Sequence, residues 1–161
     1  MTETRITLQT MPARAGVSQR PVQFDSHGAT LKGTLYTPEA GTPPHPGVIV
    51  TGAWTTVKEQ MAGTYARELA ARGFAALAFD FRGWGESGGA PRFVEDPETK
   101  TADIHAAAAF LAGLDEVDAT RLSGLGVCAS SGYMAAAVAD DARLGKLALV
   151  APWLHDPEMA K

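Results

Sequence analysis

A short apolar run that ends in small residues and passes into a helical pattern is the stretch best suited to chemistry. It covers residues 121–133, with the sequence RLSGLGVCASSGY. A strand that reverses sharply into a helix can hold one side chain up into solvent, beside the free N–H groups of the helix start. Such a turn can present a weak hydroxyl nucleophile, so this stretch predicts a nucleophile elbow.

Two residues can stand at the centre of this elbow. Centring on Ser130 gives C-A-S-S-G, with Gly132 two residues later, and centring on Cys128 gives G-V-C-A-S, with Gly126 two residues earlier. We favour Ser130 as the nucleophile, because Ser131 and Gly132 would leave its approach open. Cys128 is the alternative nucleophile. The non-catalytic interpretation is that Cys128 is a small buried strand residue and Ser130 caps a helix.

An acyl-transfer site also needs two hydrogen-bond donors that face the developing oxyanion. With Ser130 as nucleophile, the N–H of Ser131 is one predicted donor. The second is the N–H of Ala53 or Trp54, which follow the small Gly52 at the end of an apolar run. Gly52 is equally compatible with a plain tight turn.

The chain contains four histidines that could serve as the base. His27, His45 and His105 fall in a hairpin turn, a proline-rich loop and an alanine-rich helix, and each is interpreted as a surface residue. His155 and Asp156 follow the last predicted strand and are the candidate base and acid. Adjacent residues rarely orient each other in these roles, so the triad is incomplete on sequence grounds.

The elements that must position these residues alternate along the chain. A hairpin is predicted around 26–28, because apolar and polar residues alternate on both sides of it. Short apolar runs predict buried strands, and periodic segments predict helices. The strands are at 47–52, 74–81, 121–127 and 146–152, and the helices at 57–73, 101–114 and 131–139. This order predicts an α/β domain with a mostly parallel sheet and helices on both faces. Thr56 and Glu59 form a possible capping box for the first helix.

Composition narrows the partners and cofactors. The 161 residues are 45% hydrophobic, with a net charge of -4, and contain one cysteine. This composition favours one domain and gives no reason to expect nucleic acid, a membrane, a disulfide framework or a cysteine-rich metal site. No apolar segment predicts a signal peptide or a membrane span, so a cytoplasmic location is expected. Two loose G-x-G-x-x-G matches lack the following helix or acidic strand end, so no dinucleotide cofactor is expected.

Several motifs in series resemble the α/β-hydrolase superfamily, and more narrowly its dienelactone-hydrolase-related and YcjY-like esterase branch. The resemblance runs from about Val22 to Glu158 through VKEQM, FDFRGWGESGG, PRFVEDPETKTADI, GVCASSGYMAA and VAPWLHDPE. It implies a serine hydrolase that acts on a small ester-like substrate without a cofactor or metal. Asp80 and Arg82 are expected to pair with each other to hold their loop, and the non-catalytic interpretation of Lys58 and Glu59 is that they are first-turn helix residues.

The sequence departs from this family at its end. The resembling fold has eight strands, with an acid after the sixth or seventh and the histidine after the eighth, whereas the sixth strand is the last one predicted here. We therefore expect an N-terminal extension at 1–20 and an incomplete α/β-hydrolase domain at 21–161. The strand at 146–152 is apolar on both faces, so a homo-oligomer or a complementing C-terminal chain should cover it. The competing interpretation is a catalytically silent binding or assembly module.

Overall fold

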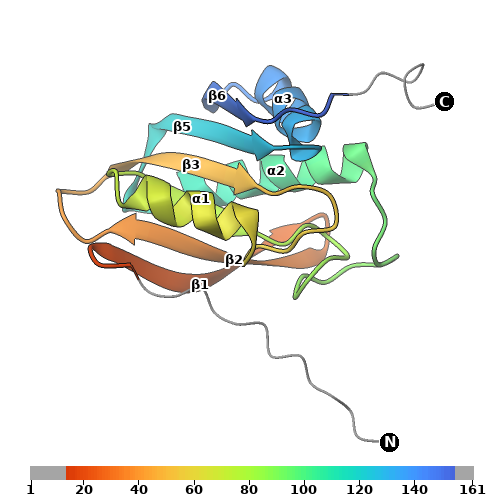
Figure 1. Ribbon diagram of the computed structural model, residues 1–161, viewed down its shortest axis with the longest axis horizontal. Coiled ribbons are helices and arrows are strands. Elements are labelled where there is room, and N and C mark those ends of the chain that lie inside the picture. The colour runs from red at the N-terminus through yellow and green to blue at the C-terminus, as the bar shows by residue number, and fades with distance from the viewer. Residues whose placement is uncertain (1–13, 155–161) are drawn as a thin grey trace, which may run out of the picture.

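The computed structural model describes residues 14–154, which form a single six-stranded sheet with helices on both faces (Figure 1). The strands are β1 (Val17–Ser26), β2 (Ala29–Pro38), β3 (His45–Thr51), β4 (Ala75–Phe79), β5 (Val117–Val127) and β6 (Leu144–Val150). The helices are α1 (Met61–Ala70), α2 (Pro97–Ala112) and α3 (Ser130–Asp140). The predicted α/β class with a mostly parallel sheet is confirmed.

The strand order is β1-β2-β4-β3-β5-β6, and the four central and C-terminal strands β4, β3, β5 and β6 are parallel. The predicted hairpin is the antiparallel pair β1 and β2, and its turn places His27 and Gly28 at positive φ. β1 begins at Val17, which pairs with Pro38. The last residues of the predicted extension at 1–20 therefore belong to an edge strand.

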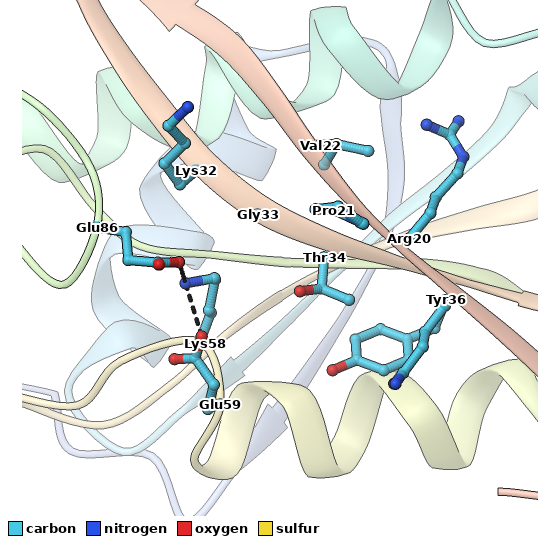
Figure 2. Close-up of a pocket in the computed structure, with 11 residues that line it drawn as sticks. Arg20, Pro21, Val22, Lys32, Gly33, Thr34, Tyr36, Lys58, Glu59 and Glu86 are labelled. Atoms are coloured by element: carbon cyan, nitrogen blue, oxygen red, sulfur yellow. Dashed lines mark hydrogen bonds and ion pairs between the residues drawn. The ribbon is translucent and has the colours of Figure 1, made fainter. Parts of the chain in front are cut away.

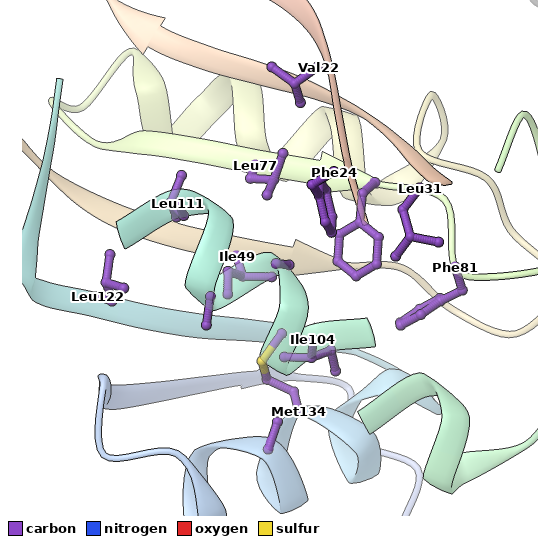
Figure 3. Packing of buried hydrophobic residues seen from close by; sticks show 14 of the residues in the cluster. Val22, Phe24, Leu31, Ile49, Leu77, Phe81, Ile104, Leu111, Leu122 and Met134 are labelled. Atoms are coloured by element: carbon purple, nitrogen blue, oxygen red, sulfur yellow. The ribbon is translucent and has the colours of Figure 1, made fainter. Parts of the chain in front are cut away.

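Strand alternation divides the core between the two faces of the sheet. Ile49 and Leu77 point to the face that α2 and α3 cover, where they pack with Met134 in the larger cluster (Figure 3). Val48 and Val50, their neighbours on β3, point to the face that α1 covers. Because successive strand residues face opposite ways, continuous apolar runs such as VIV serve a sheet that is buried on both sides.

Helix α1 begins later than the sequence predicts. Its N-cap is Gln60, with no side-chain capping bond, and the Thr56 hydroxyl instead donates to the Ala53 carbonyl at 2.7 Å. The predicted capping box is wrong, because Thr56 belongs to the turn after β3. Met61 is exposed, and the helix packs on the sheet through small residues at near-helical spacing, which are Ala62, Gly63, Ala66 and Ala70.

Strand β6 lies at the edge of the sheet (Figure 1). Its apolar pattern predicts a buried strand, whereas Lys146, Leu147 and Ala148 are exposed. Within residues 14–154, β6 is hydrogen-bonded to β5 alone, so one side of its backbone is unpaired. Burial of this strand therefore depends on what lies beside it.

Candidate active site

The predicted elbow exists as a sharp turn between β5 and α3. β5 ends at Val127, α3 begins at Ser130, and Cys128 between them has φ of 56°. A residue other than glycine rarely adopts this left-handed backbone conformation without a structural reason. Three backbone bonds hold the turn. The Cys128 N–H donates to the Val150 carbonyl at 3.0 Å, and the Cys128 carbonyl accepts from Ser131 and Trp153, each at 3.1 Å.

The two candidate nucleophiles occupy different places in this turn. Cys128 is at the positive-φ apex and keeps partial exposure. Ser130 is two residues farther on, in the first turn of α3, and only 2% exposed. Of the two, Cys128 has the backbone conformation and the access that a nucleophile elbow requires.

The neighbouring glycines agree with a turn centred on Cys128. A Cβ at Gly126 would lie 2.7 Å from the Ser130 carbonyl oxygen, so the strand and the helix can approach only because this residue is glycine. A Cβ at Gly132 would meet nothing closer than a Leu154 methyl at 3.9 Å. The glycine that suggested a Ser130-centred elbow is therefore not required by packing, whereas the one at 126 is.

The same turn bears on the predicted oxyanion donors. The Ser131 N–H is already donated to the Cys128 carbonyl. Within residues 14–154, the N–H groups of Ala53, Trp54 and Ala129 make no backbone or side-chain hydrogen bond. Ala53 and Trp54 remain predicted donors, and Ala129, which sequence reasoning missed, takes the place of Ser131 if Cys128 is the centre. Once Cys128 is chosen as the nucleophile, the residue after it is the one whose N–H is expected to face the oxyanion.

The histidines divide by location. His45 begins β3, pairs with Val117 and is 9% exposed, so its interpretation as a surface residue is wrong. It lies at the opposite end of the parallel strands from Cys128. The half-buried His105 on α2 contacts the Ala137 carbonyl at 3.4 Å, and His27 lies in the hairpin turn. The candidate base and acid, His155 and Asp156, lie outside the described residues.

A charge cluster centred on the buried side chains of Lys58 and Asp80 lies beside the loop that follows β3. The ammonium of Lys58 is within 2.9 Å of Asp80 Oδ2, 2.7 Å of Glu59 and 2.5 Å of Glu86. Burial by itself lowers the pKa of Lys58, but its hydrogen bonds to the three carboxylates outweigh burial, so the pKa is raised above its usual range. Lys58 precedes α1 and is 5% exposed, so the prediction that it is an ordinary first-turn helix residue is wrong.

The charge cluster forms one wall of a cavity of about 330 Å³ between the hairpin and the start of α1 (Figure 2). Figure 2 shows Lys58 between Glu86 and Glu59, and the Tyr36 ring also lines the cavity. Asp80 also accepts from the Lys58 N–H at 2.8 Å and the Glu86 N–H at 3.0 Å. These bonds stabilise the fold, because they connect the segment that follows β3 to the loop that follows β4.

Arg82 pairs with a different carboxylate from the one predicted. Its guanidinium donates to Asp103 Oδ1 at 2.9 Å, and its N–H donates to Asp103 Oδ2 at 2.8 Å. The expected Asp80–Arg82 pair is therefore wrong. Both residues lie beyond the end of β4, where the alternation of a strand no longer applies, so Asp80 can bind Lys58 before α1 while Arg82 binds Asp103 on α2.

Two further properties of residues 14–154 are relevant. This part of the chain contains no group of three or more His, Cys, Asp or Glu side chains arranged to hold a metal ion. None of its helices is both long and apolar enough to cross a membrane.

The parallel sheet, the helices on both faces and the strand–turn–helix at Cys128 define an α/β-hydrolase fold. The solved structure of α/β hydrolase GrgF from Penicillium sp. sh18 superimposes with a TM-score of 0.77 at 26% identity, over 84% of this chain and 46% of that one. The chain belongs to the family described as serine aminopeptidase, S33, whose model matches residues 44–160. The resemblance inferred from the motifs is confirmed.

Two bacterial relatives match more strongly in sequence. PA2218 of Pseudomonas aeruginosa is 41% identical over 138 residues, or 84% of this chain and 37% of PA2218, and its crystal structure superimposes with a TM-score of 0.86. YcjY of Escherichia coli is 47% identical over 94 residues, or 58% of this chain and 31% of YcjY. The chain thus spans less than half the length of these relatives.

Proposed function

We propose that this chain supplies the nucleophile and oxyanion donors of an enzyme that cleaves a carboxylic ester or related acyl bond through an acyl-enzyme on Cys128. The observation that carries the proposal is the positive φ of Cys128 at the turn between β5 and α3. The S33 family match and the likeness to a protein named as a hydrolase support the reaction class. A small ester-like substrate in a soluble setting is part of the same proposal, and so is a cytoplasmic location.

In this mechanism the Cys128 sulfur attacks the acyl carbon, and the carbonyl π electrons move to oxygen. The N–H of Ala129 and that of Ala53 or Trp54 donate to the oxyanion. The intermediate then collapses, the bond to the leaving group breaks, and the departing alkoxide takes the proton that the base accepted from the thiol. Water then hydrolyses the thioester, which releases the carboxylic acid and restores the Cys128 thiol. The thiolate is the nucleophilic form of cysteine, so a base must accept its proton. His155, oriented by Asp156 or by another acid, is the proposed base.

The test compares two variants of the full protein that contains this chain with the wild type. Cys128→Ala should lower hydrolysis of p-nitrophenyl esters by about a thousandfold or more, because the acyl-enzyme cannot form. Ser130→Ala should retain most of the activity, since its hydroxyl is buried behind the apex. Mass spectrometry after quenching should find the acyl group on the peptide that carries Cys128.

The opposite pattern would return the role to Ser130, the residue favoured by the sequence. A full protein that neither hydrolyses esters nor alkylates at Cys128 with iodoacetamide would instead support a catalytically silent binding module. Thiol labelling is informative in both cases, because mass spectrometry of the peptides assigns the label to Cys128 directly.

A further inference from the structure

Glu95 connects three segments that surround the candidate active site. It lies in the loop before α2, and its Oε1 accepts from the Thr55 N–H at 3.4 Å. Its Oε2 accepts from the Tyr133 hydroxyl at 3.3 Å and forms an ion pair with Lys100. One carboxylate therefore joins the loop after β3, the first turn of α3 and the first turn of α2.

Tyr133 extends this connection to Trp54. The Trp54 indole Nε1–H donates to the Tyr133 hydroxyl oxygen at 3.1 Å, while the same hydroxyl donates its proton to Glu95. Burial is the main cause that raises the pKa of Tyr133, so the hydroxyl keeps its proton at neutral pH. Both bonds can then form at once, since a phenol can accept and donate together.

Lys100 fixes the position of Glu95 from beneath. It is 4% exposed, and its ammonium lies over the rings of Phe81, Trp84 and Tyr133 at 4.7, 5.1 and 5.4 Å from their centroids. A cation held by three ring faces and one carboxylate has little freedom to move. Burial lowers the pKa of Lys100, and Glu95 is the counter-charge that favours its charged form.

The loop held by this network carries the proposed oxyanion donors. Trp54 and Thr55 come directly after Ala53, and Thr55 has φ of 57°, which a β-branched residue adopts only under constraint. A donor must lie within a few tenths of an ångström of its place to stabilise an oxyanion. The strained backbone therefore needs fixed partners at this point, and Glu95 and Tyr133 supply them.

We propose that Glu95, Tyr133 and Lys100 are positioning residues that hold the loop at 52–56, and with it the Ala53 and Trp54 N–H donors, over the nucleophile elbow. This inference rests on the proposed function. It predicts a loss confined to the transition state, because the ground-state carbonyl depends less on the donors than the oxyanion does.

The decisive variant is Tyr133→Phe in the full protein, since it removes both hydrogen bonds and keeps the ring beneath Lys100. We expect kcat for ester hydrolysis to fall by about tenfold to a hundredfold, while KM changes by less than about threefold. Glu95→Gln should shift kcat in the same direction. The matched controls are Tyr65→Phe on α1 and Glu98→Gln on α2, which leave the network intact and should behave as wild type.

Hydrogen exchange measures the loop without requiring activity. In Tyr133→Phe, the Trp54 indole N–H and the Thr55 amide should exchange at least about tenfold faster than in the Tyr65→Phe control. Unchanged exchange would overturn the inference, whether or not the wild type hydrolyses an ester. A wild type that hydrolyses no ester would count against the proposed function alone. Faster exchange with an unchanged kcat in an active enzyme would also overturn it, because the network would then be structural only.

Discussion

At the scale of single residues, the elbow depends on the side chain of Cys128 and on the lack of a side chain at Gly126. Cys128 adopts a positive φ, and the strand and helix on either side meet only because residue 126 has no side chain. The sequence pattern favoured Gly132, and with it Ser130, over Gly126 as the marker of the turn. Only the distances to the Ser130 carbonyl and to Leu154 separate them.

We predict that Gly126→Ala lowers the free energy of unfolding by about 1–3 kcal/mol and slows thiol labelling or hydrolysis at Cys128. The added methyl would lie 2.7 Å from the Ser130 carbonyl oxygen, so β5 and α3 must separate. Gly132→Ala is the control, because its methyl has room and alanine stabilises a helix by up to about 1 kcal/mol relative to glycine. Urea unfolding of both variants checks this, and equal losses would refute a Cys128-centred turn.

At the scale of elements, buried carboxylates connect loops that are distant in sequence. Asp103 on α2 is fully buried and accepts hydrogen bonds from the Ser26 hydroxyl at 2.7 Å and from two groups of Arg82. It thereby joins the end of β1, the loop after β4 and one turn of α2. Asp80 has a corresponding role on the other face through Lys58.

We expect Asp103→Ala to destabilise the fold by about 3 kcal/mol or more, since it leaves the partly buried Arg82 guanidinium without its carboxylate. Asp115→Ala, an exposed site just after the same helix, should change stability by less than about 0.5 kcal/mol. Thermal and urea unfolding followed by circular dichroism measure both. A small loss at Asp103 would mean that water or another group replaces its partners.

The turn between α3 and β6 predicts a pH dependence. Hydrogen bonds from the Arg143 side chain are the main cause that lowers the pKa of Asp141. A carboxylate with a lowered folded pKa stabilises the fold above its unfolded pKa of about 4 and loses that contribution as the pH falls through the folded value. Arg143 is 41% exposed, so the contribution should stay below about 1 kcal/mol.

Asp141→Asn should therefore be slightly less stable than wild type at pH 7, and the difference should shrink between about pH 5 and pH 2. Urea titrations at a series of pH values provide the measurement. A difference that stays constant over this range would show that the Asp141 charge does not contribute.

At the scale of the whole molecule, the described part of the sheet ends at β6, an apolar edge strand. β6 pairs with β5 on one side only within residues 14–154, and Leu147 is 40% exposed. Unpaired backbone along an apolar strand promotes association with another strand. The expected homo-oligomer or complementing C-terminal chain stays a prediction.

The isolated 161-residue chain should accordingly self-associate at micromolar concentrations in light-scattering measurements. Leu147→Lys should reduce the association, because a charge on an edge strand disfavours pairing with a second strand. Val94→Lys, which changes another exposed apolar residue far from β6 in sequence, should leave association unchanged. A stable, active monomer of the unaltered chain would show that the edge needs no partner.

The sequence by itself determined the fold class, the order of the elements and the position of the elbow. Apolar runs, helical spacing and small-residue turns are local patterns, and each depends on residues close together in the chain. The hairpin around His27 and the strand before Cys128 could therefore be predicted. The start of α1 could not, because the Thr56 hydroxyl bonds to the preceding turn instead of capping the helix.

Only the tertiary structure decided which atoms meet across the sheet. Asp80 and Arg82 are two residues apart, yet they pair with Lys58 and Asp103, at separations of 22 and 21 residues. The choice between Cys128 and Ser130 needs the same kind of information, because a difference of two residues in where β5 ends determines which side chain is at the apex of the turn and which is buried. Backbone dihedral angles and contacts between distant segments carry this information, and a pattern of residue types does not.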